Sequence, residues 1–396
     1  MKTLEDLELA DQPVFMRVDF NVPIEGGAVS SDARIRAAMP SIQHVIERGG
    51  RLALASHLGR PKGKRDMRYT LEPVAQRLSE LLDAEVRFAE DCVGDGVKGL
   101  IRELRSGQVA LLENLRFHAG EESNDPDFAR RLAAPFSRYI NDAFGASHRA
   151  HASIVGMARH FGADARAAGY LLGKEAKGLG RLLEEPERPF VAVVGGAKVS
   201  DKLGVLDALL GRADVICIGG AMAYTFLRAR GVPVGASKVE EDKLRVAGEL
   251  LERARHRDVR MLLPVDHVGA TEFSAAASAR YITEEALPAE TMGLDIGQST
   301  RKIFLEQLQT AGSIFWNGPM GVFEWEKFSE GTMAIARAIA DCTGYTVVGG
   351  GDSVAAVEAA GVVDTINHVS TGGGASLEFL EQGSLPGLDV LEGKLD

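Results

Sequence analysis

The feature that most limits what this chain can fold into is a series of short apolar runs that alternate with helix-like segments. The runs at residues 14–18, 52–55 and 191–194 have the length of buried strands, and the segment at 34–48 has helical spacing. Each run ends in a polar or glycine-rich loop. Because parallel strands need long crossover connections, which are usually helical, this alternation predicts parallel sheets with helices on both faces.

The length of the chain, 396 residues, exceeds what one hydrophobic core normally organises, so we expect two domains. A charged, proline-containing stretch at residues 184–189 is typical of a domain boundary, and the segment before it has the character of a connecting helix. We therefore expect an N-terminal domain over residues 1–168, a linker helix over 169–185 and a C-terminal domain over 186–376.

The composition narrows the set of partners and compartments. The formal net charge of −11 argues against nucleic acid or an anionic membrane surface as a partner. No run approaches the ~20 apolar residues of a membrane helix, and the N-terminus lacks the pattern of a signal peptide. Cys92, Cys217 and Cys342 are odd in number and far apart, which favours buried free thiols in a reducing compartment. We expect a soluble, cytoplasmic protein.

Polar and charged side chains follow the apolar runs of the first half of the chain. One such residue alone is more often surface charge than ligand, but parallel sheets bind ligands at their strand ends, so the repeated placement predicts a common site. Arginine and histidine there suit a small, multiply charged acid, because guanidinium groups pair with carboxylate and phosphate oxygens. A zinc site is the weaker alternative, since the histidines lack cysteine or carboxylate partners at ligand spacing. The candidates are Asp19, Asn21, Arg34, His57, Arg60, Arg116, His118, His148, Arg149 and His151.

Glycine replaces arginine as the dominant loop residue in the second half of the chain. One glycine turn could be purely structural, but several at successive strand ends indicate backbone amides wrapped around phosphates and a nucleoside. The glycine-containing loops lie at residues 195–196, 219–220, 317–321, 349–351 and 372–374.

The stretch FVAVVGGAKVSDK, residues 190–202, carries two lysines into what we predict to be the first turn of a helix. Lys198 and Lys202 are four residues apart, so on a helix they share one face. Because lysines oppose the dipole at a helix N-terminus, this placement indicates a bound polyanion that compensates. The simpler alternative is a strand–helix turn with two solvated lysines. The chain contains no G-x-x-x-x-G-K-[ST] phosphate loop.

Two acidic residues of the second half have both a structural and a ligand-binding interpretation. Asp352 could cap a helix or hold magnesium, which favours one or two carboxylates plus phosphate oxygens. Glu324 could accept hydrogen bonds from ribose hydroxyls or face solvent. Together, an arginine and histidine site and a glycine and lysine site fit phosphoryl transfer between a small acid and a nucleotide, which needs positioning and charge neutralisation more than a nucleophilic side chain.

In its motifs the chain resembles the phosphoglycerate kinase family over nearly its whole length. Eight blocks in one order, on both halves, carry the resemblance and make it highly specific. They are RVDFNVP (17–23), SHLGRP (56–61), LLENLRFH (111–118), NDAFGASHRAH (141–151), VVGGAKVSDK (193–202), FWNGPMGVFE (315–324), GGGDS (349–353) and STGGGASLEFL (370–380).

The resemblance implies two doubly wound, Rossmann-like parallel-sheet domains joined by a helix, with the C-terminal tail, residues 377–396, packing back on the N-terminal, phosphoglycerate-binding domain. It implies the glycolytic reaction in which magnesium-dependent transfer of a phosphoryl group from 1,3-bisphosphoglycerate to ADP gives 3-phosphoglycerate and ATP. The transfer would be direct, in a monomer whose lobes close by a hinge motion that excludes water.

The resemblance also assigns roles to residues that match the family's motifs. The phosphoglycerate would be bound by Asp19, Phe20, Asn21, Arg34, His57, Leu58, Gly59, Arg60, Arg116 and Arg149. The transferred group would be stabilised by Arg34, Lys198 and Gly374. The nucleotide would be bound by Lys198, Lys202, Gly219, Gly220, Gly293, Asn317, Glu324, Gly350, Gly351, Asp352 and Ser353, with Asp352 also holding the metal.

Two positions depart from the family's usual pattern. Gln298 stands where proline is usual, and His267 stands where an apolar residue is usual. Both put the shape of the loops near the nucleotide pocket in doubt, although not the reaction. None of the charged positions assigned to substrate or phosphate is replaced.

Two other functions compete with phosphoryl transfer. A Rossmann-type, NAD-dependent dehydrogenase requires G-x-G-x-x-G after a strand, and GGAK at residues 195–198 does not have that spacing. A catalytically silent binding protein of the same shape is favoured by the loss of charged loop residues, and no such loss is evident.

Overall fold

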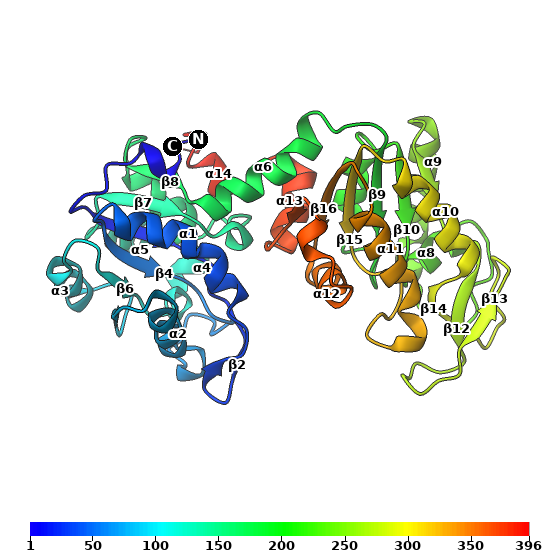
Figure 1. Cartoon of the computed structure of the whole chain (residues 1–396), viewed down its shortest axis with the longest axis horizontal. Coiled ribbons are helices and arrows are strands. Elements are labelled where there is room, and N and C mark those ends of the chain that lie inside the picture. The colour runs from blue at the N-terminus through cyan, green and yellow to red at the C-terminus, as the bar shows by residue number, and fades with distance from the viewer. Residues whose placement is uncertain (396) are drawn as a thin grey trace. The chain divides into compact units, whose positions relative to one another are not determined.

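The structure is a computed structural model that describes residues 1–395, and the chain divides into two compact units (Figure 1). Unit 1 comprises residues 1–177 and the segment that begins at Ser384, while unit 2 is the continuous segment Gly178–Gly383. The division falls inside helix α6 (Tyr170–Glu184), between Lys177 and Gly178.

Unit 1 is built on a six-stranded sheet in which every strand pair is parallel. In spatial order its strands are β5 (Val86–Phe88), β6 (Val109–Leu111), β4 (Arg51–Ala55), β1 (Pro13–Arg17), β7 (Arg138–Asn141) and β8 (Arg166–Ala168). The central strands are almost wholly buried, as expected when helices cover both faces of a parallel sheet.

The longer helices of unit 1 each bury one apolar face. The longest of them before α6, α1, buries Ile35, Ala38, Ile42 and Val45, which are spaced three or four residues apart. The helices are α1 (Ala33–Glu47), α2 (Glu72–Leu82), α3 (Asp95–Glu103), α4 (Ala119–Glu122), α5 (Pro126–Ala133) and α14 (Pro386–Asp389), and a small hairpin pairs β2 (Ile24–Glu25) with β3 (Ala28–Val29).

Unit 2 repeats the plan with a second parallel sheet of six strands. Their spatial order is β11 (Arg260–Leu262), β10 (Val215–Ile218), β9 (Phe190–Val194), β15 (Ser313–Asn317), β16 (Tyr345–Gly349) and β17 (His368–Val369). The helices are α7 (Leu203–Leu209), α8 (Met222–Ala229), α9 (Leu244–His256), α10 (Gln298–Gln309), α11 (Glu330–Ala340), α12 (Gly351–Ala359) and α13 (Gly374–Gln382). The prediction of two doubly wound, parallel-sheet domains is confirmed.

Unit 2 also contains an antiparallel sheet that the sequence pattern did not predict. Strand β12 (His267–Ala270) lies between β13 (Arg280–Ile282) and β14 (Met292–Ile296). No helix separates these three strands along the chain, so the rule that alternation indicates parallel pairing does not apply to them.

The C-terminal segment packs on unit 1 from Ser384 onward, whereas residues 377–383 of the implied tail lie in unit 2. The amide of Gly387 donates a hydrogen bond to the carbonyl of Ser147 (2.9 Å), and Arg159 Nε donates to the carbonyl of Leu395 (2.6 Å). Helix α13, in contrast, belongs to unit 2.

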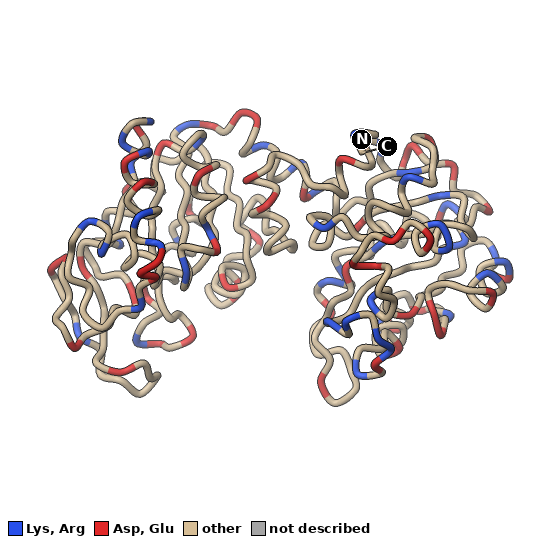
Figure 2. The backbone as a smooth tube through the Cα atoms, turned by 180° about the vertical axis from the view of Figure 1, so that it is seen from behind, with Lys and Arg blue, Asp and Glu red and all other residues tan. Residues whose placement is uncertain are grey.

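The surface and the thiols fit the composition. Acidic and basic residues are spread over both units, so the net negative charge leaves room for local basic sites (Figure 2). Within residues 1–395, no helix is both long enough and apolar enough to cross a membrane. All three cysteines are free; Cys92 and Cys217 are buried, whereas Cys342 is half-buried.

Candidate functional site

The predicted arginine and histidine residues of unit 1 converge at one edge of its sheet. Strands β6, β4, β1 and β7 are neighbours and run parallel, so the loops that follow them meet at their carboxyl ends. Those loops carry Arg116, His57, Asp19 and Arg149, respectively. The first turn of α1 adds Arg34.

Direct contacts connect these loops. Arg34 Nη1 donates to Asp19 Oδ2 at 2.9 Å. The amide of Gly59 donates to Asn21 Oδ1 at 2.9 Å, and Arg116 Nη1 donates to the carbonyl of Gly59 at 2.8 Å. Side chains from three strand-end loops and one helix therefore form a single cluster, which we call the basic cup.

Beneath the basic cup lies Arg17, which is fully buried and which the sequence interpretation did not include. Its Nη2 lies 3.1 Å from His57 Nδ1. Because guanidinium only donates, Nδ1 accepts and the proton of the neutral ring resides on His57 Nε2. Burial, followed by the charge of Arg17, holds the pKa of His57 well below its ordinary value, so this ring stays neutral.

A buried carboxylate, Glu121, accompanies Arg17. Arg17 Nε donates to Ser153 Oγ (2.9 Å), which in turn donates to Glu121 Oε1 (2.6 Å). The amide of Ser153 donates to Glu121 Oε2 (2.9 Å). Burial raises the pKa of Glu121, while the charge of Arg17 opposes that rise. An arginine at the end of an apolar strand was the one available signal for this network; Glu121 gave none.

The basic cup contains buried polar atoms that are left without a hydrogen bond, although Arg116 Nε lies 3.4 Å from Glu122 Oε1 in an ion pair. Among residues 1–395, Asp19 Oδ1, Arg116 Nε and His151 Nδ1 are buried and lack a hydrogen-bond partner. Burial, with the charges of Arg17 and Arg116, lowers the pKa of His151 to about 3. Buried polar groups are normally paired, so these atoms indicate a site for a polar ligand.

Other predicted residues of this site occupy its rim or its support, whereas His118 is paired elsewhere, with its Nε2 2.7 Å from Asp91 Oδ1. Arg60 and Arg149 are exposed; Arg149 Nε donates to His148 Nε2 at 3.2 Å. Phe20 and Leu58 are buried, and the amide of Phe20 donates to Ser56 Oγ at 2.8 Å.

In unit 2, the turn after β9 differs from the prediction. Helix α7 begins at Leu203, so Lys198 and Lys202 do not share the face of a first helical turn, and that prediction is wrong. The amides of Val199 and Ser200 donate hydrogen bonds to the carboxylate of Glu240 (2.5 and 3.1 Å). The Glu240 side chain therefore satisfies the backbone amides at the point where the sequence predicted a helix to begin. Lys198 is exposed, and none of residues 1–395 forms an ion pair or hydrogen bond with its amine.

Lys202, at the N-cap of α7, joins this turn to two further strand ends. Its Nζ donates to Asn317 Oδ1, and Asn317 Nδ2 donates to the carbonyl of Gly349 at 2.8 Å. Burial lowers the pKa of Lys202, while Asp201 and Asp352 act in the opposite direction. Gly350, with φ of +92°, passes so close to Asn317 that a Cβ there would lie 2.8 Å from Nδ2.

A pocket of about 500 Å³ opens beside these residues. Of the predicted nucleotide-binding residues it is lined by Gly220, Gly293, Glu324 and Asp352. Its other lining residues, most of them apolar and not predicted, are Gly196, Ala197, Ala221, Tyr224, Ala236, Lys238, Phe273, Met292, Leu294, Pro319, Met320, Gly321 and Val322. The size and the apolar walls with few polar groups suit a nucleoside.

Three other predicted glycine and serine positions do not line the pocket. A Cβ on Gly219 would lie 2.4 Å from the sulfur of Met320, so a larger residue there would require the Met320 side chain to move. Ser353 Oγ accepts from the amide of Gly318 at 2.6 Å. Gly374 is the exposed first residue of α13.

Asp352 lies on the lining of this pocket. The N-cap of α12 is Gly350, with no side-chain cap, so the alternative of a capping aspartate does not hold. The carboxylate of Asp352 is exposed, lines the pocket and accepts no hydrogen bond from the rest of residues 1–395. An exposed carboxylate on the lining of this pocket is a candidate ligand for magnesium, which takes one or two carboxylates and completes its shell with phosphate oxygens and water.

The two residues that depart from the family pattern, Gln298 and His267, lie in different environments. Gln298 is the exposed first residue of α10, after the N-cap Gly297, a position at which proline and glutamine are both tolerated. His267 is buried, its Nε2 lies 2.9 Å from the carbonyl of Glu285 and its Nδ1 lies 3.3 Å from the hydroxyl of Tyr224. Since a carbonyl only accepts, His267 donates through Nε2 and Tyr224 donates to Nδ1.

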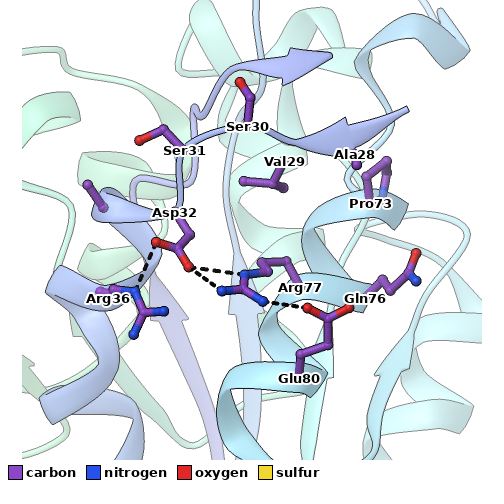
Figure 3. A pocket seen from close by; sticks show the side chains of 11 residues that line it. Ala28, Val29, Ser30, Ser31, Asp32, Arg36, Pro73, Gln76, Arg77 and Glu80 are labelled. Atoms are coloured by element: carbon purple, nitrogen blue, oxygen red, sulfur yellow. Dashed lines mark hydrogen bonds and ion pairs between the residues drawn. The ribbon is translucent and has the colours of Figure 1, made fainter. Parts of the chain in front are cut away.

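A second, more open pocket of about 650 Å³ lies in unit 1, between the start of α1 and α2 (Figure 3). Asp32 lies at its centre and accepts from Arg36 Nε (2.9 Å) and from Arg77 Nη2 (2.7 Å). Arg77 also donates to Glu80 at 2.5 Å. Because these charges neutralise one another, the network ties the N-terminus of α1 to α2 rather than offering a site for an ion.

The fold and the two sites define a class: two-unit α/β proteins that combine a side-chain anion site with a glycine-lined pocket. A sequence model of the family described as phosphoglycerate kinase matches residues 4–383. The phosphoglycerate kinase of Anaeromyxobacter sp. (strain K) is 57% identical over 395 residues, or 99% of each chain. That of Moorella thermoacetica is 53% identical over 392 residues, again 99% of each. The chain belongs to the phosphoglycerate kinase family.

Solved structures agree with this assignment. The structure of phosphoglycerate kinase from Coxiella burnetii matches with a TM-score of 0.88 and 40% identity, over 99% of this chain and 98% of that one. The enzyme from Pyrococcus horikoshii OT3 matches with a TM-score of 0.82 and 36% identity, over the same shares.

Proposed function

We propose that this chain is an active phosphoglycerate kinase that transfers a phosphoryl group from 1,3-bisphosphoglycerate to ADP, giving 3-phosphoglycerate and ATP. An oxygen of the terminal phosphate of ADP forms the new P–O bond. The bond between phosphorus and the acyl oxygen breaks, and its electron pair remains on the carboxylate of 3-phosphoglycerate. The observation that carries the proposal is the pairing, in a member of this family, of a basic cup with unmatched polar atoms and a lysine-flanked, glycine-lined pocket.

The basic cup supports binding of the phosphoglycerate. Arg34, Arg60, Arg116 and Arg149 supply cationic donors for carboxylate and phosphate oxygens. His57 adds a neutral donor at Nε2, because Arg17 occupies Nδ1. We assign the predicted residues Asp19, Phe20, Asn21, Leu58 and Gly59 to the same site, as its acceptors and its walls.

The pocket of unit 2 supports binding of the nucleotide. Its apolar walls suit the base, Glu324 suits the ribose hydroxyls, and Lys202 with the amides near Gly350 suits the phosphates. We assign Gly219, Gly220, Gly293, Asn317, Gly351 and Ser353 to the same site. Asp352 would hold magnesium, which when bound neutralises charge on the phosphate oxygens.

Charge on the moving group would be met by Lys198 from unit 2 and Arg34 from unit 1. Lys198 has no partner among residues 1–395, so its charge is available. The amides at the start of α13, from Gly374 onward, add helix N-terminal donors. The chain supplies positioning and charge neutralisation, which is what phosphoryl transfer requires.

We further propose the functional division of the chain. Residues 1–168 with the segment that begins at Ser384 would bind phosphoglycerate, residues 169–185 would link the domains, and residues 186–376 would bind nucleotide. We also propose that the protein acts as a monomer in the cytoplasm.

The test is magnesium-dependent formation of ATP from 1,3-bisphosphoglycerate and ADP, measured with purified, folded protein in a coupled assay. Turnover that disappears without magnesium or without ADP is the expected result. Turnover at background overturns the proposal. If ADP still binds in calorimetry, that failure favours the silent binding protein, whereas reduction of NAD in the presence of a hydroxy acid favours the dehydrogenase.

A further inference from the structure

The turn that carries the two lysines of unit 2 is held by a carboxylate from a distant segment. Glu240 Oε2 accepts from the amides of Val199 (2.5 Å) and Ser200 (3.1 Å), and Glu240 Oε1 accepts from Ser200 Oγ (2.6 Å). Two consecutive amides and a hydroxyl around one carboxylate resemble the donor set with which a strand–helix turn binds phosphate. Here the protein's own side chain fills it.

Glu240 is itself fixed to the body of unit 2. Its amide donates to Thr225 Oγ1 at 3.1 Å, and Thr225 is buried on α8. Burial acts to raise the pKa of Glu240, but the hydrogen bonds from Ser200 and Val199 outweigh it and leave that pKa lowered. The group therefore stays ionised at neutral pH and bridges α8 to the turn.

The residues that Glu240 holds lie between the two lysines. Val199 directly follows Lys198, and the amide of Lys202 donates to the carbonyl of Val199 at 2.9 Å. Helix α7, a short helix of seven residues, holds the turn only at its C-terminal side, where the helix begins. Without Glu240 the turn would keep two amides that neither α7 nor the sheet satisfies.

We propose that Glu240 is a positioning residue that fixes Lys198 and Lys202 for phosphoryl transfer by occupying the amides of the turn between them. It touches neither substrate nor the transferred group; it acts through the backbone of Val199 and Ser200. The expected effect on catalysis rests on the proposed function. The structural role of Glu240, which is to hold the backbone of Val199 and Ser200, does not depend on that function.

The kinetic test compares Glu240→Ala, Glu240→Gln and Glu241→Ala with the unsubstituted protein. Glu241 is the adjacent exposed glutamate, and its side chain bonds to none of residues 1–395, so it is a matched control. We expect Glu240→Ala to lower kcat about tenfold to a hundredfold, as a displaced catalytic group does, with the KM for 3-phosphoglycerate unchanged. Glu240→Gln keeps one acceptor oxygen and should restore most of the rate, and Glu241→Ala should match the unsubstituted protein.

Amide hydrogen exchange tests the structural part without any turnover. We expect the amides of Val199 and Ser200 to exchange faster in Glu240→Ala and to exchange at the native rate in Glu241→Ala. This readout also covers the case in which the unsubstituted protein has no activity, which would overturn the proposed function alone.

Three results would overturn the inference. The first is native kcat in a folded Glu240→Ala protein. The second is unchanged exchange of the two amides in that protein. The third is tighter binding of ADP by Glu240→Ala, because it would mean that Glu240 competes with phosphate for the turn instead of positioning the lysines. Glu240→Gln, the more conservative change, provides the same measurements if the alanine variant does not fold.

Discussion

The two units use the same sheet architecture but build their sites from different materials. In unit 1 the site is made of side chains, and its charges continue inward to Arg17 and Glu121, which are buried. In unit 2 the site is made largely of backbone and apolar walls, with Lys198 and Asp352 exposed at its edge. A buried charge network couples function to folding, whereas an exposed charge on a rigid turn can be removed at little cost in stability.

Replacing Arg17 by methionine should have the largest effect of the substitutions that test this difference between the units. The change leaves Glu121 buried without its cation and releases His57 from its fixed tautomer, so we expect the free energy of unfolding to fall by about 3–5 kcal/mol and binding of 3-phosphoglycerate to weaken. Urea unfolding followed by circular dichroism measures the first effect. Both tryptophans, Trp316 and Trp325, lie in unit 2, so fluorescence then follows that unit separately. Native stability would show that unit 1 does not depend on this network.

Replacing Lys198 by alanine should have the opposite profile. We expect kcat to fall by about two to three powers of ten, the usual result of removing one preorganised charge stabiliser, with no change in unfolding midpoint because the side chain is exposed. Lys302→Ala, at an exposed position on α10, is the control and should retain full activity. A near-native rate for Lys198→Ala would refute the role proposed for it.

The pH dependence of stability should differ between the units. Burial raises the pKa of Asp142 in unit 1 to about 6 and that of Asp295 in unit 2 to about 7, from an ordinary value of 3.8. Between the ordinary and the raised pKa the folded state keeps a proton that the unfolded chain has released. This contribution is therefore complete below about pH 4 and is lost as the pH rises through the folded pKa.

We expect the free energy of unfolding to decline from about pH 4 upward. The contribution of Asp142 should be lost near pH 6, and that of Asp295 in unit 2 should go on declining to about pH 7. Asp142→Asn and Asp295→Asn should each remove the corresponding part of the decline. Unfolding curves at half-unit pH intervals measure it, and a slope that survives both substitutions would assign the dependence to other groups.

The smallest effect should come from the pair Tyr224 and His267, which joins α8 to the antiparallel sheet; Tyr224 lines the pocket of unit 2. Because their 3.3 Å hydrogen bond is neutral, we expect a coupling energy of about 0.5–1 kcal/mol in ADP binding from a double-mutant cycle with Tyr224→Phe and His267→Leu. Additive effects would show that His267 has no part in holding the pocket.

The sequence predicted which loops form the sites better than it predicted how they are held. The positions of Asp19, His57 and Arg116 followed from strand ends, because parallel topology brings those ends together whatever the details of packing. Glu121 and Glu240 escaped prediction because each acts on a distant segment, 32 residues away for Glu121 and 41 for Glu240, and local pattern carries no signal of such a contact.

The prediction of a helix start at the lysines failed for the same reason. Local spacing favoured a helix from Lys198, but the distant carboxylate of Glu240 satisfies the amides that would have begun it, and α7 starts at Leu203. The antiparallel sheet of unit 2 was missed because three short strands without intervening helices give no alternation.

The discontinuity of unit 1 has a consequence for the order of assembly during synthesis. Unit 2 is one uninterrupted segment, so all of its strands are available once Gly383 has left the ribosome. Unit 1 precedes most of unit 2 along the chain but lacks the segment whose Gly387 bonds to Ser147 until that segment has also emerged. The half of the molecule that is translated first is therefore the half that is completed last.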